Sequence, residues 1–202
     1  MIQISVLVSG RGTNLQSIID AIENGQIRNA KISCVISDKK DAYALARAKT
    51  HHIPGIFIDP KTFSSRQEFD NRLLEILKEN KTDLVLLAGY LRILSDGVIS
   101  EYKNKMLNIH PSLLPAFPGL HAQKQALEYG VKVSGCTVHF VEPALDKGPV
   151  ILQKTVPVLP GDSEETLAAR ILVEENKAYP EAVNLFVENK IKIDGRNVTI
   201  LD

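Results

Sequence analysis

The feature that most constrains the fold is a repeated alternation between short apolar runs and longer amphipathic segments. The segments between the runs have apolar residues three or four positions apart, as on one face of a helix. Strands that alternate with helices of this length indicate an α/β, Rossmann-like fold, with a mostly parallel, twisted sheet and helices on both faces. The apolar runs occupy residues 2–8, 30–37, 54–58, 83–88 and 105–109, and the helical patterns follow residue 13 and cover 41–50 and 65–79.

The pattern changes after residue 130. Two strand-like runs, 133–141 and 150–158, are separated by about eight residues, too few for a helical crossover, so we expect an antiparallel strand pair in the C-terminal half. A long helix is predicted from about residue 163 to 188, with a kink at Pro180. Asp194-Gly195 predicts a hairpin turn in the tail.

The charge balance argues against several kinds of partner. The 202 residues contain 24 Lys plus Arg and 24 Asp plus Glu, whereas a nucleic-acid surface is usually basic. No apolar run approaches ~18 residues, and the N-terminus lacks the basic region of a signal peptide. We expect a cytoplasmic protein with small-molecule ligands, no membrane association and two buried free thiols, Cys34 and Cys136.

A glycine-containing loop, Ser9-Gly10-Arg11-Gly12-Thr13-Asn14, joins the first predicted strand to the first predicted helix. Free backbone N–H groups and the helix dipole favour an anion there, and Gly10 and Gly12 let the backbone approach a phosphate. The third glycine of a dinucleotide fingerprint is missing, because Leu15 takes its place. An ordinary turn capped by Thr13 or Asn14 explains the segment equally well. If the loop binds a ligand, a phosphate monoester fits better than a dinucleotide.

The segment around Asn108 and His110 carries the clearest chemical signal. Two residues apart at the end of a predicted strand, these side chains point to the same face. An amide that can hydrogen-bond an oxyanion then lies beside an imidazole that can transfer a proton, a pairing that suits acyl transfer. The prolines that follow, at 111, 115 and 118, stiffen the loop and help to preorganise the site.

The remaining histidines have simpler explanations. His51-His52 indicates a solvated turn, and His121 a helix start. His139 lies in an alternating strand, where cross-strand packing is the expected role. No pair of these residues has the spacing of a known metal motif, so we expect no metal.

Two acidic residues are further candidates. Asp146 lies between the two antiparallel strands, where an aspartate is normally solvated; if the turn folds over His110, its carboxylate would favour the protonated imidazole. Glu175 falls on the apolar stripe of the long helix, between Ile171 and Tyr179. A carboxylate there either lies at the rim of the stripe or receives hydrogen bonds from a bound amine or hydroxyl.

Five segments, in the same order, give the chain a close resemblance to the phosphoribosylglycinamide formyltransferases, a family of folate-dependent formyltransferases. The resemblance covers nearly the whole chain, and the Asn-x-His-Pro-Ser-Leu-Leu-Pro motif is highly specific for folate-dependent formyl transfer. The segments are Val8–Leu15, Leu87–Leu94, Asn108–His121, Gly135–Val141 and Leu145–Ile151.

The resemblance implies a cytoplasmic one-carbon transferase of purine synthesis. Its donor would be 10-formyltetrahydrofolate, its acceptor the amine of glycinamide ribonucleotide, with no metal, and a homodimer stays open. A single domain would comprise a phosphate-binding half, about 1–105, and a catalytic and folate-binding half, about 106–202. Asn108 and His110 would stabilise a tetrahedral intermediate, while Asp146 would keep His110 charged.

Further site residues follow from the resemblance position by position. Gly12, Thr13 and Asn14 match the loop that holds the ribose phosphate, and Glu175 matches an acid that contacts the glycinamide substrate. The folate-site matches are Arg66, Leu91, Arg92, Ile93, Leu94 and Asn108, and residues 141–146 would line the pterin pocket. Lys147 replaces a common glycine and Arg11 lies at a variable position.

Four alternative functions stay open. A methionyl-tRNA formyltransferase would be expected to carry a tRNA-binding domain and a basic surface, and a formyltetrahydrofolate deformylase an extra N-terminal domain. A non-catalytic phosphate-sugar binding module would leave Asn108 and His110 without a role. A nicotinamide-dependent oxidoreductase conflicts with the incomplete fingerprint.

Overall fold

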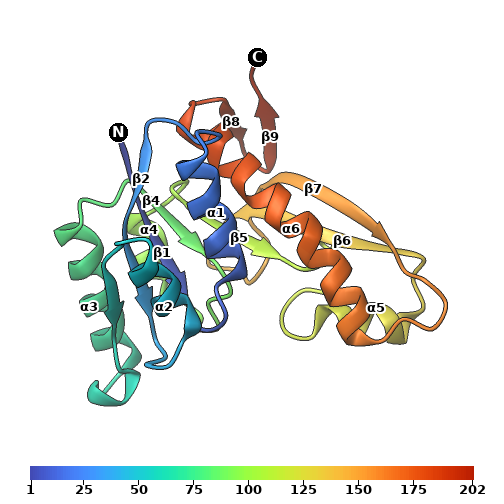
Figure 1. The fold of residues 1–202 in the computed structure, drawn as a ribbon, viewed down its shortest axis with the longest axis horizontal. Helices are drawn as coiled ribbons and strands as arrows, with labels where there is room; N and C mark the ends of the chain where they lie inside the picture. The colour runs from blue at the N-terminus through green and yellow to red at the C-terminus, as the bar shows by residue number, and fades with distance from the viewer. The chain divides into compact units, whose positions relative to one another are not determined.

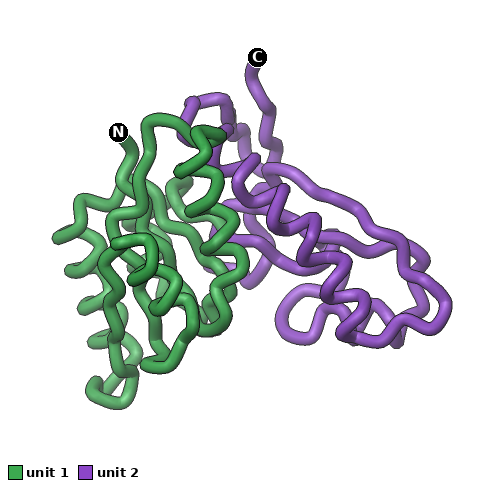
Figure 2. Tube along the Cα trace, in the orientation of Figure 1, with its two compact units in different colours: residues 1–107 green, residues 108–202 purple.

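The computed structural model describes residues 1–202, which divide into two compact units, 1–107 and 108–202 (Figure 2). The last strand of the first unit, β5 (Met106–His110), continues into the second unit, so that Asn108 and His110 begin the second unit.

The first unit contains the alternation that the sequence predicts. Its strands are short and largely buried, and four of its elements are helices of six to fourteen residues. In chain order the elements are β1 (Ile2–Val8), α1 (Thr13–Glu23), β2 (Ala30–Ser37), α2 (Tyr43–Thr50), β3 (Gly55–Phe57), a short 3-10 helix (Pro60–Thr62), α3 (Arg66–Glu79), β4 (Leu84–Leu87) and α4 (Asp96–Glu101).

The strand order identifies a doubly wound sheet. Seven strands follow the order β3-β2-β1-β4-β5-β6-β7, and β1 pairs in parallel with both β2 and β4. The chain therefore steps outward from β1 to β3 and then returns to β4. Because parallel crossovers are right-handed, α1 and α2 cover one face and α3 the other. The carboxyl ends of β1 and β4 form the switch point, where ligands bind in open sheets of this kind.

The second unit contains an antiparallel pair covered by a long helix. β6 (Val133–Phe140) pairs antiparallel with β7 (Val150–Pro157), and α5 (Ala122–Tyr129) precedes the pair. Figure 1 shows α6 (Glu164–Val187) running along β6 and β7. A final hairpin joins β8 (Ile191–Asp194) to β9 (Asn197–Ile200).

Each unit has its own apolar core. Phe69, with the buried faces of α1 and α3, closes the core of the first unit, whereas Phe140 and Tyr179 are fully buried in the second. Burying side chains of this size stabilises a fold by roughly 1.5–3 kcal/mol each. The apolar stripe predicted for α6 is buried along Leu167 and Ile171 and continues past Pro180.

The predicted fold class is confirmed: a mostly parallel α/β sheet has an antiparallel pair in its C-terminal half. The tail hairpin predicted at Asp194-Gly195 is present, and the predicted element bounds agree with the structure to within a few residues. The sequence did not predict α4, a helix of six residues, because so short a segment shows little periodicity. No helix of the chain combines the length and apolar character needed to cross a bilayer.

Candidate active site

Strand β5 presents Asn108 and His110 on one face, because side chains alternate along a strand. His110 is 5% exposed, and Asn108 is half-buried. The low exposure of His110 makes hydrogen bonding obligatory for its ring, whereas the half-buried amide of Asn108 is also open to a ligand or to solvent.

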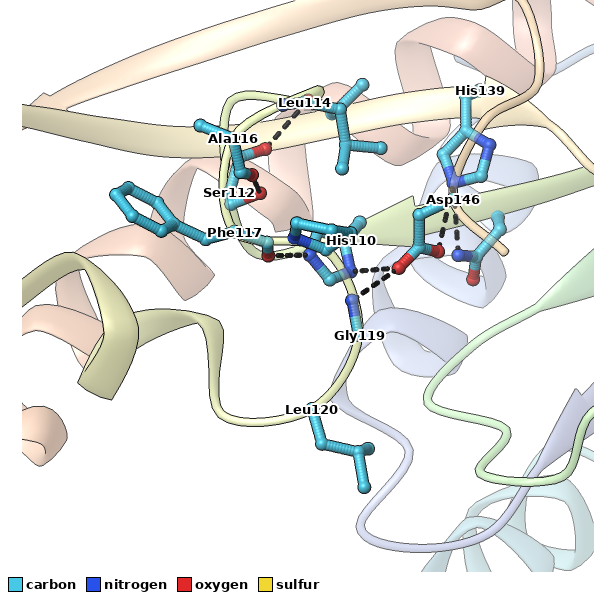
Figure 3. Close-up of polar contacts among 12 residues, drawn as sticks. His110, Ser112, Leu114, Ala116, Phe117, Gly119, Leu120, His139 and Asp146 are labelled. Atoms are coloured by element: carbon cyan, nitrogen blue, oxygen red, sulfur yellow. Dashed lines mark hydrogen bonds and ion pairs between the residues drawn. The ribbon is translucent and has the colours of Figure 1, made fainter. Parts of the chain in front are cut away.

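The two ring nitrogens of His110 face two oxygen atoms. Nε2 lies 2.9 Å from the carbonyl oxygen of Phe117 and donates a hydrogen bond to it, and Nδ1 lies 3.5 Å from Oδ2 of Asp146 (Figure 3). Both neighbours are acceptors, so the arrangement suits the imidazolium, which carries a proton on each nitrogen. The distance at Nδ1 exceeds the usual hydrogen-bond range, so this N–H can donate to a ligand oxygen.

The Asp146 carboxylate is held in place by the loop that follows β5. Its Oδ2 accepts a hydrogen bond from the backbone N–H of Gly119 at 2.8 Å, and only 6% of its side chain is exposed. The backbone of Asp146 is left-handed, with φ at +52°, which a non-glycine residue adopts only when its surroundings require it. The structure thus brings Asp146 to His110, whereas from the sequence this approach depended on whether the turn folds over His110.

His139 joins the same cluster, although its strand position predicts only packing. Its Nδ1 donates to the carbonyl oxygen of Phe140 at 2.8 Å, which leaves Nε2 as an acceptor for the Asn108 amide at 3.2 Å. Burial lowers the pKa of His139, so the ring is neutral. The 3.8 Å approach of Nε2 to Oδ1 of Asp146 is therefore not an ion pair at neutral pH.

Two signals could have identified His139. Nearly every residue of β6 is buried, so a histidine within it needs a polar partner wherever it points. The β6–β7 register also shifts between Val138 and His139, and such a bulge redirects side chains, often beside an active site. Of these two signals, only the place of a histidine within this predicted strand is visible in the sequence, because the register shift belongs to the folded strand pair.

The proline-containing loop after His110 is fixed by neighbouring hydroxyl and amide groups. Thr137 Oγ1 donates to the carbonyl of Ser112 and accepts from the N–H of Leu114, at 2.7 and 3.0 Å. Gln153 donates to Leu114 O at 2.9 Å, and the Leu114–Pro115 peptide is cis. These contacts fix the first half of the loop whose Phe117 carbonyl accepts the hydrogen bond from His110.

In the first unit, the glycine-containing loop leaves the start of α1 open. Gly12 is the N-cap residue, with φ at +72° and no side-chain cap. A Cβ at this position would lie 2.7 Å from the Cβ of Ala44, so only glycine fits. Thr13 and Asn14 are the first helical residues, and the positive end of the helix dipole at this N-terminus favours an anion.

Ser9 connects this loop to the segment after β4. Its hydroxyl donates to Oδ1 of Asp38 at 2.6 Å and accepts from the backbone N–H of Leu91 at 3.0 Å. Leu91 and Ile93 are 67% and 62% exposed, whereas Leu94 is buried. Two of the four predicted folate-site residues of this segment therefore present apolar side chains to solvent.

The two arginines among the folate-site predictions have different environments. Arg92 stacks on the ring of Phe69, at 4.4 Å from its centroid. Arg66 lies 3.7 Å from the buried carboxylate of Asp70 and borders a hollow of about 530 Å³ that Ser95 also lines. Arg66 is half exposed and can therefore reach a ligand.

Glu175 lies on the buried face of α6 and is 8% exposed, so the structure places it inside the apolar stripe. Cys34 and Cys136 are buried free thiols, as predicted. No group of three or more His, Cys, Asp or Glu side chains is arranged to hold a metal ion.

Comparison with known proteins gives a consistent picture. Residues 2–183 match the family described as formyl transferase. Phosphoribosylglycinamide formyltransferase of Escherichia coli is 44% identical over 190 residues, which cover 94% of this chain and 89% of that protein. A crystal structure of glycinamide ribonucleotide transformylase 1 from Symbiobacterium toebii has 53% identity and a TM-score of 0.98, over 100% of this chain and 95% of the other.

A longer relative also matches. The trifunctional purine biosynthetic protein adenosine-3 of Drosophila pseudoobscura pseudoobscura is 47% identical over 94% of this chain, which spans only 14% of that protein's length. The family match, the near-complete coverage of the E. coli enzyme and the Asn108–His110 geometry lead to the same conclusion: this chain belongs to the formyl transferase family.

Proposed function

We propose that this chain transfers the formyl group of 10-formyltetrahydrofolate to the amine of glycinamide ribonucleotide, a step of purine biosynthesis. The observation that carries the proposal is the cluster of Asn108, His110 and Asp146, in which an amide and an imidazole share one strand face. The bacterial relatives named above support the choice of acceptor, since both names specify this formyl transfer.

In the proposed reaction the acceptor amine attacks the formyl carbon, and negative charge develops on the formyl oxygen. Asn108 has a second amide N–H beyond the one directed at His139, and His110 has the N–H at Nδ1. Two preorganised donors aimed at a developing oxyanion are often worth ~3 kcal/mol each. Collapse of the intermediate forms the new C–N bond and breaks the bond to N10.

The proton balance requires one transfer. The attacking amine loses a proton and N10 of the leaving folate gains one, so a group between them must accept and release it. Asp146, 3.5 Å from His110 Nδ1, is the carboxylate assigned to this task, and it also stabilises the imidazolium.

No nucleophilic side chain of the enzyme takes part in this scheme. Burial raises the pKa of the Cys136 thiol to about 12 and also raises the pKa of Cys34. Neither thiol forms the thiolate that covalent catalysis needs at neutral pH. Direct transfer between the two substrates is the mechanism consistent with these residues.

The acceptor is assigned to two sets of residues. The backbone N–H groups at Gly12, Thr13 and Asn14 bind the ribose phosphate, because a helix N-terminus without a side-chain cap favours an anion. Glu175, on the buried face of α6, is assigned to the glycinamide portion, whose amine and hydroxyl groups can donate to a carboxylate oxygen.

The folate is assigned to the segment after β4 and to Arg66. The exposed side chains of Leu91 and Ile93 offer apolar area to the pterin and aminobenzoyl rings. Arg92 and Leu94 are assigned to the same site by their place in this segment, and Leu94 is buried beneath it. Arg66, at the edge of its hollow, can bind a glutamate carboxylate of the folate tail. Both substrates are soluble small molecules, so we place the enzyme in the cytoplasm, as a monomer or homodimer.

The test is a formyl-transfer assay with 10-formyltetrahydrofolate, with and without glycinamide ribonucleotide. We expect tetrahydrofolate to form only when the amine is present, together with formylglycinamide ribonucleotide. Formate release without the amine would instead indicate a deformylase. Calorimetry that detected ribonucleotide binding, with no transfer at any pH, would indicate a binding module.

A further inference from the structure

The loop that carries Asp146 receives a contact from the C-terminal hairpin. The guanidinium of Arg196 donates a hydrogen bond from Nη1 to the backbone carbonyl of Lys147 at 2.7 Å. Arg196 lies 49 residues further along the chain, in the two-residue turn between β8 and β9, directly after Gly195, whose φ is +58°. The hairpin lies outside residues 2–183, the part that matches the formyl transferase family.

The loop needs such a restraint because of its backbone geometry. Asp146 is in the left-handed region, which non-glycine residues seldom adopt, so contacts of the neighbouring peptides help to hold this conformation. On one side, the N–H of Lys147 donates to Ala144 O at 3.2 Å. On the other, Gly148 packs so closely against the Phe140 carbonyl that an added Cβ would clash.

Arg196 restrains the same loop through its hydrogen bond to the Lys147 carbonyl. The Lys147 carbonyl follows Asp146 by one residue, so a charged donor on it limits how the peptide between Asp146 and Gly148 can rotate. Hydrogen bonds with a charged partner are the stronger kind. The guanidinium binds a carbonyl oxygen and not a carboxylate, so it holds the loop without neutralising Asp146.

We propose that Arg196 is a positioning residue for formyl transfer: through the Lys147 carbonyl it holds the Asp146 loop in the geometry that places the carboxylate at His110. This inference rests on the proposed function. The tail hairpin supplies no side chain to the cluster of Asn108, His110 and Asp146. Its role in the reaction would be to hold the loop that carries Asp146.

The test compares four full-length proteins: wild type, Arg196→Met, Arg196→Lys and Lys192→Met. Methionine keeps a flexible, unbranched side chain, although a shorter one, and removes the donors, whereas lysine keeps the positive charge and a donor group. Lys192 lies on the same hairpin and makes no side-chain hydrogen bond or ion pair. Lys192→Met therefore removes one positive charge from the hairpin without removing a contact, and serves as the control.

Two readouts are measured for each protein: steady-state transfer, and hydrogen exchange of the backbone amides of residues 141–149. For Arg196→Met we expect about a fivefold fall in kcat, the scale of one net hydrogen bond, with KM for glycinamide ribonucleotide unchanged. We also expect faster exchange in the loop. Arg196→Lys should recover most of kcat, and Lys192→Met should match wild type.

Three results would overturn the proposal: unchanged exchange in Arg196→Met, faster exchange with unchanged kcat, or an equal effect in Lys192→Met. If Arg196→Met fails to fold, the Arg196→Lys protein decides: loop exchange close to wild type with most of kcat retained supports the carbonyl anchor, and a fivefold or larger fall in kcat, or faster loop exchange, contradicts it. Absence of transfer in the wild type would instead refute the proposed function.

Discussion

Replacing Asp146 by asparagine removes the negative charge that faces His110 while keeping the shape of the side chain. The asparagine oxygen can still accept the hydrogen bond from the Gly119 N–H, so the loop geometry should persist. The change therefore removes the charge of the carboxylate and its capacity to carry the proton, and separates both from its contribution to loop structure.

The expected loss of rate follows from the distance between Asp146 and His110 and from the burial of both side chains. Two unit charges 3.5 Å apart attract by ~5 kcal/mol at an effective dielectric constant of ~20, and the side chains of His110 and Asp146 are both largely buried. Only the part of this energy that acts in the transition state affects the rate. We expect kcat for Asp146→Asn to fall by about 10²–10³-fold, or roughly 3–4 kcal/mol.

The assay is tetrahydrofolate formation at saturating glycinamide ribonucleotide, with the melting temperature measured in parallel. Asp41→Asn is the control, because Asp41 is exposed and makes no side-chain hydrogen bond or ion pair. A kcat within about threefold of wild type would refute the electrostatic reasoning, since at ~1.4 kcal/mol per factor of ten it would leave less than about 1 kcal/mol for the charge.

Three further predictions concern the phosphate loop, the second imidazole and the start of α6. Gly12→Ala should lower both the melting temperature and the affinity for glycinamide ribonucleotide in calorimetry, whereas Gly10→Ala, whose added methyl meets nothing within 4 Å, should leave both unchanged. His139→Phe removes the acceptor that orients the neighbouring amide and should lower kcat about tenfold with little change in KM; an unchanged kcat would contradict that role. Arg170 holds the pKa of Asp162 well below its ordinary value of 3.8, so the unfolded chain binds the proton more readily and stability falls as the pH drops below about 4; denaturant titrations should show this loss in wild type and a smaller one in Asp162→Asn.

The fold could be predicted because each strand and helix is specified by the residues within it, and the pairing of neighbouring strands by the length of their connection. The periods of the apolar runs separate strand from helix, and the connection lengths separate parallel crossovers from the antiparallel β6–β7 pair. The six-residue α4 was not predicted, since its periodicity extends over fewer than two turns.

The same local reasoning reaches only part of the site. Asn108 and His110 share a face because they are two residues apart on one strand, which the sequence states directly. Asp146 reaches His110 through a contact with Gly119, 27 residues away, and through a left-handed backbone that no sequence pattern specifies. The role of His139 depends on the shifted register of β6 and β7, a property of the folded pair.

The most direct test of the central claim is the single-turnover rate of formyl transfer by Asn108→Ala and His110→Ala, each shown to be folded by its melting transition. Both donors act on the same developing oxyanion, so each loss should slow transfer by about 10²-fold or more, the effect of removing one preorganised donor. Near-wild-type rates in either folded variant would contradict the assignment of this pair to formyl transfer.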